Sequence, residues 1–264
     1  MLLQVVMMVI CGQMGINMKK IIIFFLIAVG FIYPQIQQHH LSIIKKRVVA
    51  GGNPYVTDSL KYSWLYSDLE DGDITANEWI DQVISKPFTN VGSDPNKSSS
   101  GVTFDINDYV YSSTGFAFTD NVSMEIVVYL PDSTTDKGIC NIKSGDYAFG
   151  LTLRSSYLNA QATPNDGGTN YYADSYSTPA VGANVHIIAT WDGSSIPKLY
   201  VNGTLLANKS GINGGSYGTF AVILGYVGGA FPDGIIKLFR VYHQVLDATE
   251  ALQNYNSDSV QGLL

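Results

Sequence analysis

The chain has 264 residues, enough for one large β domain with an N-terminal extension. All 22 acidic residues lie at Asp58 or later, whereas the region from Thr57 onward holds only 10 of the 15 basic residues, so its formal net charge is −12. Such an acidic body repels phosphate backbones, which argues against nucleic-acid binding and leaves neutral glycans, cations and basic protein surfaces as partners. Cys11 and Cys140 have no metal-ligand spacing and indicate no disulfide.

Residues 1–56 are predicted to lie outside the β domain. Met18-Lys19-Lys20 precedes the 13-residue apolar run IIIFFLIAVGFIY, a pattern typical of a secretory signal peptide and short for a membrane span of about 20 residues. The apolar residues ahead of the lysines do not fit this pattern, and one explanation is that translation starts at Met18. An uncleaved membrane anchor, or an arm that docks on a partner, is the alternative. We therefore expect an extracellular or cell-surface location with membrane contact through this segment, and a virion as the alternative location.

The body of the chain is built from short apolar runs with a period of two. Leu60, Tyr62 and Trp64 alternate with other residues, and the alternation is clearest over Val122–Leu130. Further runs follow at residues 138–143, 147–154 and 157–162. Regular strands at this spacing predict an antiparallel sandwich or barrel.

A cluster of acidic residues follows the first of these runs. Its members are Asp68, Glu70, Asp71 and Asp73. Carboxylate oxygens are calcium ligands, and we take these four as candidate metal ligands. The spacing departs from an EF-hand because Gly72 falls one place early, so a solvated turn is the alternative interpretation.

Residues 163–180 are predicted to form a loop that binds a ligand. Its candidate ligand-binding residues are Asn165, Asp166, Tyr171, Tyr172, Asp174 and Tyr176. Tyrosine rings stack on the apolar faces of sugars, and the neighbouring Asp and Asn side chains hydrogen-bond to hydroxyl groups. Tyrosine is also common in ordinary β proteins, and the chain has 17.

Residues 185–207 predict a strand pair followed by a tight hairpin. Val185, Ile187 and Trp191 share one face of the first strand, and His186 lies on the other. Asn202-Gly203 is the strongest short hairpin signal. Residues 234–242 form the last long strand, and a short run at residues 219–225 forms another.

A helix of about two turns is predicted near the C-terminus. Asp247 is its expected N-cap, and Glu250 completes a capping box. Leu246, Leu252 and Tyr255 are expected to seat the helix on the sheet.

Several of these segments, in order, resemble one known family. They are T-W-D-G with K-L-Y-V-N-G-T at residues 190–204, residues 118–129, and residues 233–242 followed by 246–255. Together they are similar to laminin-G-like, concanavalin A-like jelly-roll domains. The resemblance implies an all-β, two-sheet antiparallel jelly-roll sandwich over residues 57–256, with residues 1–56 before it and a tail at residues 257–264. It also implies that a structural calcium ion is a cofactor to test.

Some relatives in this superfamily are glycoside hydrolases, which use two carboxyl groups about 5 Å apart in retaining enzymes. The β-glucanases carry E-x-D-x-x-E on one strand, but here Glu125 is followed by Val127 and Leu130 in the other two places. Glu125 is therefore expected to be an exposed polar residue, and His186 and His243 ordinary sheet residues. Since no other catalytic motif is present, no catalytic residue and no enzymatic activity are predicted.

The sequence predicts a non-catalytic recognition module, a lectin or adhesion domain for carbohydrate or a cell-surface receptor. A structural or adhesion component, such as a bacteriophage fibre or capsid-decoration protein with the jelly roll as scaffold, is the alternative. An atypical glycoside hydrolase is the second alternative. Assembly into a homo-oligomer is open in each case.

Overall fold

The computed structural model describes the chain from Tyr55 to Leu264 with gaps, all within the compact unit Val49–Leu264. The described residues are 55–69, 71–74, 79–80, 82–83, 88–90, 95–105, 108–112, 121–130, 137–144, 147–154, 157–163, 170–175, 182–193, 196–206, 208–213, 222–225 and 234–264. The predicted signal or anchor segment, with Met18, lies outside them. Among the described residues, none of the helices has the length and apolar character needed to span a membrane.

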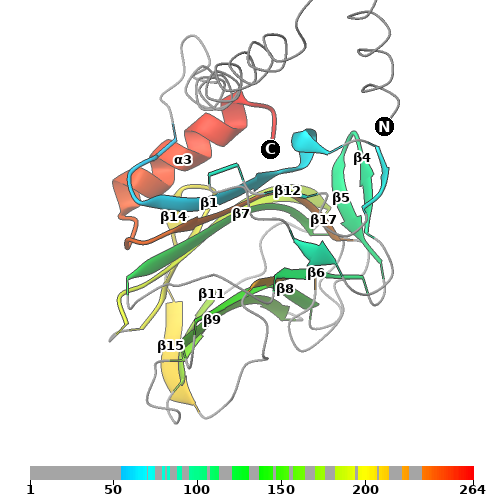
Figure 1. The fold of residues 1–264 in the computed structure, drawn as a ribbon. Coiled ribbons are helices and arrows are strands. Elements are labelled where there is room, and N and C mark those ends of the chain that lie inside the picture. Colours follow the sequence, from blue (N-terminus) through cyan, green and yellow to red (C-terminus); the bar gives the residue numbers. More distant parts are fainter. Residues whose placement is uncertain are drawn as a thin grey trace, which may run out of the picture. The chain divides into compact units, whose positions relative to one another are not determined.

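The described strands form two antiparallel sheets, which lie one above the other in Figure 1. The first sheet contains β1 (Leu60–Leu65), β2 (Gly72–Asp73), β4 (Asn96–Ser98), β5 (Gly101–Phe104), β7 (Val122–Leu130), β12 (Ala183–Trp191), β13 (Lys198–Val201), β14 (Thr204–Leu205) and β17 (Gly234–Tyr242). The second sheet contains β3 (Thr89–Asn90), β6 (Val110–Ser112), β8 (Lys137–Ser144), β9 (Tyr147–Arg154), β10 (Tyr157–Thr163), β11 (Asn170–Ser175), β15 (Asn208–Asn213) and β16 (Val222–Leu224).

The first sheet has the order β14-β13-β12-β7-β17-β5-β4-β2, with β1 also paired to β17. The second sheet has the order β15-β11-β10-β9-β8-β16-β6-β3. A short 3₁₀ helix, η1 (Tyr66–Asp68), follows β1, and the helix α3 (Ala248–Val260) follows β17. The all-β, two-sheet antiparallel sandwich predicted from the sequence is confirmed.

The main hydrophobic core lies between the two sheets. Met124, Ile126 and Val128 of β7 belong to it, together with Phe149 and Leu151 of β9. These residues alternate along their strands, because successive side chains of a strand point to opposite faces. The period of two seen in the sequence therefore marks the residues that join the sheets.

The hairpin predicted at Asn202-Gly203 connects β13 to β14. Both residues have positive φ, 49° and 74°, as a type I′ turn requires. β12 pairs with β13 in the register Ile187↔Val201. The strand pair and hairpin predicted over residues 185–207 are therefore confirmed.

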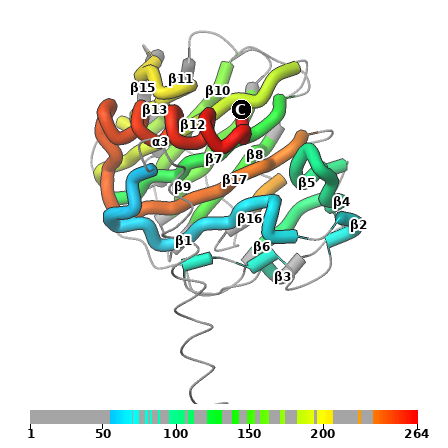
Figure 2. Tube along the Cα trace, turned by 90° about the horizontal axis from the view of Figure 1, so that it is seen from above, coloured from blue at the N-terminus to red at the C-terminus, as the bar shows by residue number. Residues whose placement is uncertain are grey.

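The outer face of the first sheet, which points away from the second sheet, is covered by α3 (Figure 1). Seen from above in Figure 2, α3 crosses β12 and β7. Ser123 fixes the approach to the helix, because its hydroxyl donates to the Gln244 carbonyl at 2.6 Å and accepts from the Leu246 amide at 2.9 Å. Because the second sheet covers one face of β7 and α3 covers the other, both faces of this strand are buried.

The helix begins with the predicted capping box, in which Asp247 accepts from the amides of Thr249 and Glu250. It has 13 residues and so exceeds the two turns predicted, and the expected domain end at residue 256 falls inside it. Of the three residues expected to seat the helix, Leu246 is buried and the Tyr255 ring contacts His186, whereas the Leu252 side chain is 46% exposed and lies against the Gly203 turn. Ala251, Asn254 and Asp258 are buried on the helix itself.

The loop predicted over residues 163–180 is wrong in part. Asn170–Ser175 is β11, paired on one side with β10 and on the other with β15. Tyrosine favours strands once partners are present. β10 is the preceding strand of the chain, but β15 comes from a separate segment further along it, and the turn residues of this region do not reveal that second partner.

Candidate functional site

A row of polar and aromatic residues crosses the outer face of the second sheet. Starting from Asn141 on β8, the residues directly opposite one another are Gly150 on β9, Gln161 on β10 and Tyr172 on β11. Paired residues of antiparallel strands share a face. The neighbouring positions Leu151 and Ala160 belong to the core, so this row points away from it.

The row continues in the other direction to Tyr111 on β6. Asn141 is paired with Ile223 on β16, an apolar residue within the row, and Ile223 is paired with Tyr111. The Tyr111 ring lies beside that of Tyr109, with centroids 6.2 Å apart. Because adjacent strands are about 4.8 Å apart, the row from Tyr111 to Tyr172 spans roughly 24 Å.

The middle of this row is shielded, and its ends are partly exposed. Asn141 is 2% exposed, and its Oδ1 has no hydrogen-bond partner among the described residues. Asn159 and Thr152, paired with each other beside the row, are also buried. Gln161 and Tyr172 are partly exposed. The row thus contains two amide side chains, a glycine without a side chain and an aromatic ring at each end.

The structure separates the ligand-binding residues predicted from the sequence. Tyr171 and Tyr172 are consecutive in β11, so their side chains point to opposite faces. Tyr171 is paired with Ala162 on the core side, and only Tyr172 belongs to the outer row. Asp174 is opposite Asn159 in the backbone register. Asn165, Asp166 and Tyr176 lie outside the described residues.

The described members of the predicted calcium cluster are exposed, and each contacts a neighbouring side chain. Gln82 donates to Asp68, Lys97 pairs with Asp71, and Asn96 donates to Asp73 at 2.9 Å. These three carboxylates form no group of converging ligands among the described residues. Glu70 lies outside that part of the chain, and calcium binding here stays a prediction.

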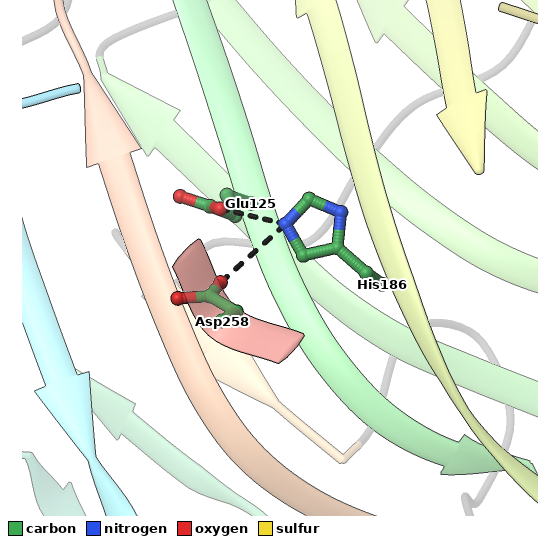
Figure 3. A group of neighbouring side chains, drawn as sticks. All are labelled: Glu125, His186 and Asp258. Carbon is green, nitrogen blue, oxygen red and sulfur yellow. Dashed lines mark hydrogen bonds and ion pairs between the residues drawn. The ribbon is translucent and has the colours of Figure 1, made fainter. Parts of the chain in front are cut away.

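A second polar cluster is buried between the first sheet and α3. Figure 3 shows its centre, where His186 of β12 lies between Glu125 of β7 and Asp258 of α3. His186 Nε2 is 2.7 Å from Glu125 Oε1 and 3.5 Å from Asp258 Oδ2. All three side chains are 0% exposed.

Arg240 of β17 joins both carboxylates of this cluster. It forms a bidentate pair with Asp258, both distances 3.1 Å, and its Nη1 is 3.2 Å from Glu125 Oε2. The same Glu125 oxygen accepts from the Tyr242 hydroxyl at 2.6 Å and from Asn254 Nδ2 at 3.1 Å. Glu125 is thus the most heavily hydrogen-bonded member.

The charges of the cluster set its protonation. Burial opposes ionisation of Glu125, but Arg240 and His186 together lower its pKa to about 2. Burial acts to lower the pKa of His186, but Asp258 and Glu125 raise it to about 9. Burial raises the pKa of Asp258, and Arg240 opposes that shift. Two acids are therefore balanced by Arg240 and by a proton on His186.

Glu125, His186 and Asp258 are also the described group whose ligand atoms lie within 4.8 Å of one another, as a metal site requires. Three observations argue against a metal ion. Arg240 already lies 3.2 Å from Glu125, and the side chains are inaccessible to solvent. A metal-binding histidine usually donates its other N–H to an acceptor, but His186 Nδ1 has no partner among the described residues.

The same cluster brings an oxygen of Glu125 within 4.8 Å of an oxygen of Asp258, and retaining glycoside hydrolases hold two carboxyl groups about 5 Å apart. Both Glu125 and Asp258 are buried under α3, so a sugar cannot reach them. The separation alone therefore does not indicate catalysis.

The prediction that Glu125 is an exposed polar residue is wrong. Its face of β7 is the one covered by α3, which the strand pattern alone does not reveal. A usable signal lay elsewhere, since Asn254 and Asp258 are four residues apart and share a helix face with Ala251. Polar residues on the inner face of an amphipathic helix require partners, and Glu125, His186 and Arg240 supply them.

The sequence model of the concanavalin A-like lectin/glucanases superfamily matches residues 104–251. The chain belongs to this superfamily. No curated protein matches its sequence. The family match agrees with the resemblance described above and confirms the two-sheet fold, while the superfamily itself contains both lectins and glucanases.

Solved structures resemble the fold at low sequence identity. The Botulinum Neurotoxin Type G Receptor Binding Domain has a TM-score of 0.55 and 15% identity, covering 77% of this chain and 52% of that one. Trypanosoma rangeli sialidase in complex with sialic acid has a TM-score of 0.60 and 10% identity, covering 87% and 39%. The chain thus spans about half or less of these proteins, and the likeness concerns the fold.

Proposed function

We propose that the protein is a recognition module that binds a neutral carbohydrate on the outer face of its second sheet. The observation that carries this proposal is the row from Tyr111 to Tyr172, with Asn141, Gly150 and Gln161 between the two rings. Amide side chains both donate to and accept from hydroxyl groups, and tyrosine rings offer an apolar face. This is the chemistry a saccharide presents.

Gln161 and Tyr172 are the residues of the row that a ligand would contact first, because they are partly exposed whereas Asn141 is 2% exposed. The net charge of −12 from Thr57 onward favours a neutral glycan over a sialylated one. The similar structures include a receptor-binding domain and a sialidase bound to sialic acid, which supports recognition of glycans or receptors in general.

The lack of catalytic activity is part of this proposal. The two close carboxylates are buried, and the outer row carries amide and hydroxyl groups. Export directed by the N-terminal segment would bring the module to glycans at a cell surface. A virion is the alternative location. These locations are also proposals.

Adjacent tyrosines provide the test. Tyr172→Ala should reduce affinity for neutral oligosaccharides, selected on a glycan array, by more than twofold and up to about tenfold in titration calorimetry, since ring stacking contributes about 0.5–1.5 kcal/mol. Tyr171→Ala is the matched control, because it removes the same side chain from the opposite face of the same strand. Its affinity should remain within about twofold of wild type.

Equal losses in both variants, or no loss in Tyr172→Ala, would contradict the proposed site. An array on which no neutral glycan binds would contradict the proposed function. Release of reducing sugar from any glycan that does bind would instead favour the hydrolase alternative.

A further inference from the structure

The buried cluster around Glu125 connects three parts of the chain that are far apart in sequence. Besides strands of the first sheet and α3, it includes the segment Tyr55–Val56. The Val56 amide donates to Asn254 Oδ1 at 2.6 Å, and the Arg240 guanidinium lies 4.0 Å from the centre of the Tyr55 ring. We call Tyr55–Val56 the N-terminal strap.

Few apolar contacts hold α3 and this strap. One small cluster consists of Val56, Ile188, Tyr200, Tyr242, Leu246 and Ala251, and a second of Leu65, Val127, Leu238 and Leu263. Both are much smaller than the core between the sheets. Segments with little buried apolar area open at lower free energy than the core does. The position of α3 is therefore sensitive to the charge balance of the polar cluster under its middle, because an uncompensated buried charge is costly.

The protonation of His186 sets the charge of this cluster. Because the ionised Glu125 carboxylate only accepts hydrogen bonds, Nε2 of His186 must be the donor to it. The titrating proton is then the one on Nδ1, which has no hydrogen-bond partner among the described residues. With this proton, Glu125 and Asp258 are balanced by Arg240 and His186. Without it, a net charge of −1 is buried.

The groups around His186 come from every element packed against it. Glu125 lies on β7, Arg240 and Tyr242 on β17, and Asp258 on α3. The ring of Tyr255, also on α3, meets His186 edge-on with centroids 5.8 Å apart. Asn202, after β13, accepts from the backbone amide of His186. Further titratable groups on this side of the sheet are Tyr200 and Lys198 on β13, Tyr129 on β7 and the helix-start acids Asp247 and Glu250, and the Tyr55 ring lies over Arg240.

We propose that α3 and the N-terminal strap form a latch on the outer face of the first sheet, which opens when His186 loses its second proton. Opening exposes Glu125 and Asp258 to water and so removes the cost of burying an unbalanced charge. The strap would be released with the helix, since Asn254 of α3 holds Val56. Loss of the proton thereby frees α3 and the strap, while the sandwich stays folded.

The direction of the effect follows from the pKa of His186, which rises from 6.5 to about 9 in the closed state. A group with a raised pKa stabilises the closed state fully below pH 6.5, and this stability is lost as the pH rises toward 9. The equilibrium constant for opening α3 should therefore increase by up to about tenfold per pH unit over this range.

Hydrogen exchange of the full chain, followed by mass spectrometry from pH 6.5 to 9, tests the latch. Protection factors, corrected for the intrinsic pH dependence of exchange, should fall up to about tenfold per pH unit in α3, while those of β7 and β9 change little. His186→Gln keeps a donor near Glu125 but carries no charge. In this variant, protection of α3 should be low and independent of pH. His243→Gln, at the end of β17 and outside the cluster, is the control and should keep the wild-type dependence.

Constant protection of α3 across this range in the wild type would overturn the proposal. Parallel loss of protection in α3 and β7 would also overturn it, because it would mean that the whole sandwich opens. The comparison within the wild-type protein decides the question even where His186→Gln does not fold.

Discussion

At the scale of single residues, Glu125 is the centre of the buried polar cluster. It is inaccessible to solvent and accepts hydrogen bonds from His186, Tyr242 and Asn254. A buried ion cluster adds little stability in itself, because desolvation offsets the attraction, but removing one member leaves an uncompensated charge. Each member is therefore sensitive to substitution.

Arg240→Met should lower the free energy of unfolding by about 3–5 kcal/mol, because Glu125 and Asp258 would both lose their fixed counter-charge. Urea denaturation at pH 7 measures this change. Lys198→Met is the control: Lys198 is exposed on β13 and its replacement should change the stability little. Equal stability of Arg240→Met and wild type would show that Glu125 and Asp258 do not need the positive charge of Arg240.

At the scale of elements, the hairpin β13–β14 and α3 are built against each other. Gly203 in the hairpin turn has φ of +74°, and a Cβ atom there would lie 2.9 Å from Leu252 Cδ1 and 3.2 Å from Leu252 Cα. The turn type requires positive φ, and the helix leaves no space for a side chain. Glycine at this position thus serves both the turn and the contact with α3.

Gly182 provides a matched comparison, because its φ is also +74° but nothing lies within 4 Å of an added Cβ. Gly182→Ala should destabilise the protein by about 1–2 kcal/mol through backbone strain alone. Gly203→Ala carries the same strain and must also displace Leu252, so its thermal midpoint should be clearly lower. If the two variants melt together, α3 does not press on the hairpin in solution.

At the scale of the whole molecule, two layers of sheet and one helix create two different environments. The main core joins the sheets, whereas the outer face of the first sheet is covered by α3 over a charged cluster. The outer face of the second sheet carries the row from Tyr111 to Tyr172. The proposed latch and the proposed binding row are thus on opposite sides of the sandwich, so each can be tested independently of the other.

Global stability should fall in acid through Glu125. Its pKa drops from 4.5 to about 2 on folding, so its stabilising contribution is present above pH 4.5 and is lost as the pH falls toward 2. Asp258 has the opposite effect on stability as the pH falls, because its pKa is raised in the folded state and its protonation therefore favours folding. The urea midpoint of the wild type should decrease between pH 4.5 and 2, and the decrease should be smaller in Glu125→Gln. Asp58→Asn, at an exposed position, is the control and should retain the wild-type slope.

Much of the fold could be predicted from local sequence. The period of two over Val122–Leu130, the Asn202-Gly203 turn and the Asp247–Glu250 capping box each depend on residues close in sequence, and each is confirmed. The strand β11 could not be predicted in this way, because one of its two partners, β15, is contributed by a segment further along the chain. The candidate ligand-binding residues Tyr171 and Tyr172 are neighbours in sequence, but the pleat of β11 points their side chains to opposite faces of the sheet.

The sequence by itself thus determined the fold class, the turns, the helix cap and the superfamily, because these depend on periodicity and on backbone chemistry within a few residues. Only the tertiary structure decided that Glu125, His186, Arg240 and Asp258 form one cluster, and that Asn141, Gln161 and Tyr172 lie in one row. The reason is physical. Which face of a strand meets water, another strand or a helix depends on register and layer packing across the whole chain, and the alternation of side chains is the same in every case.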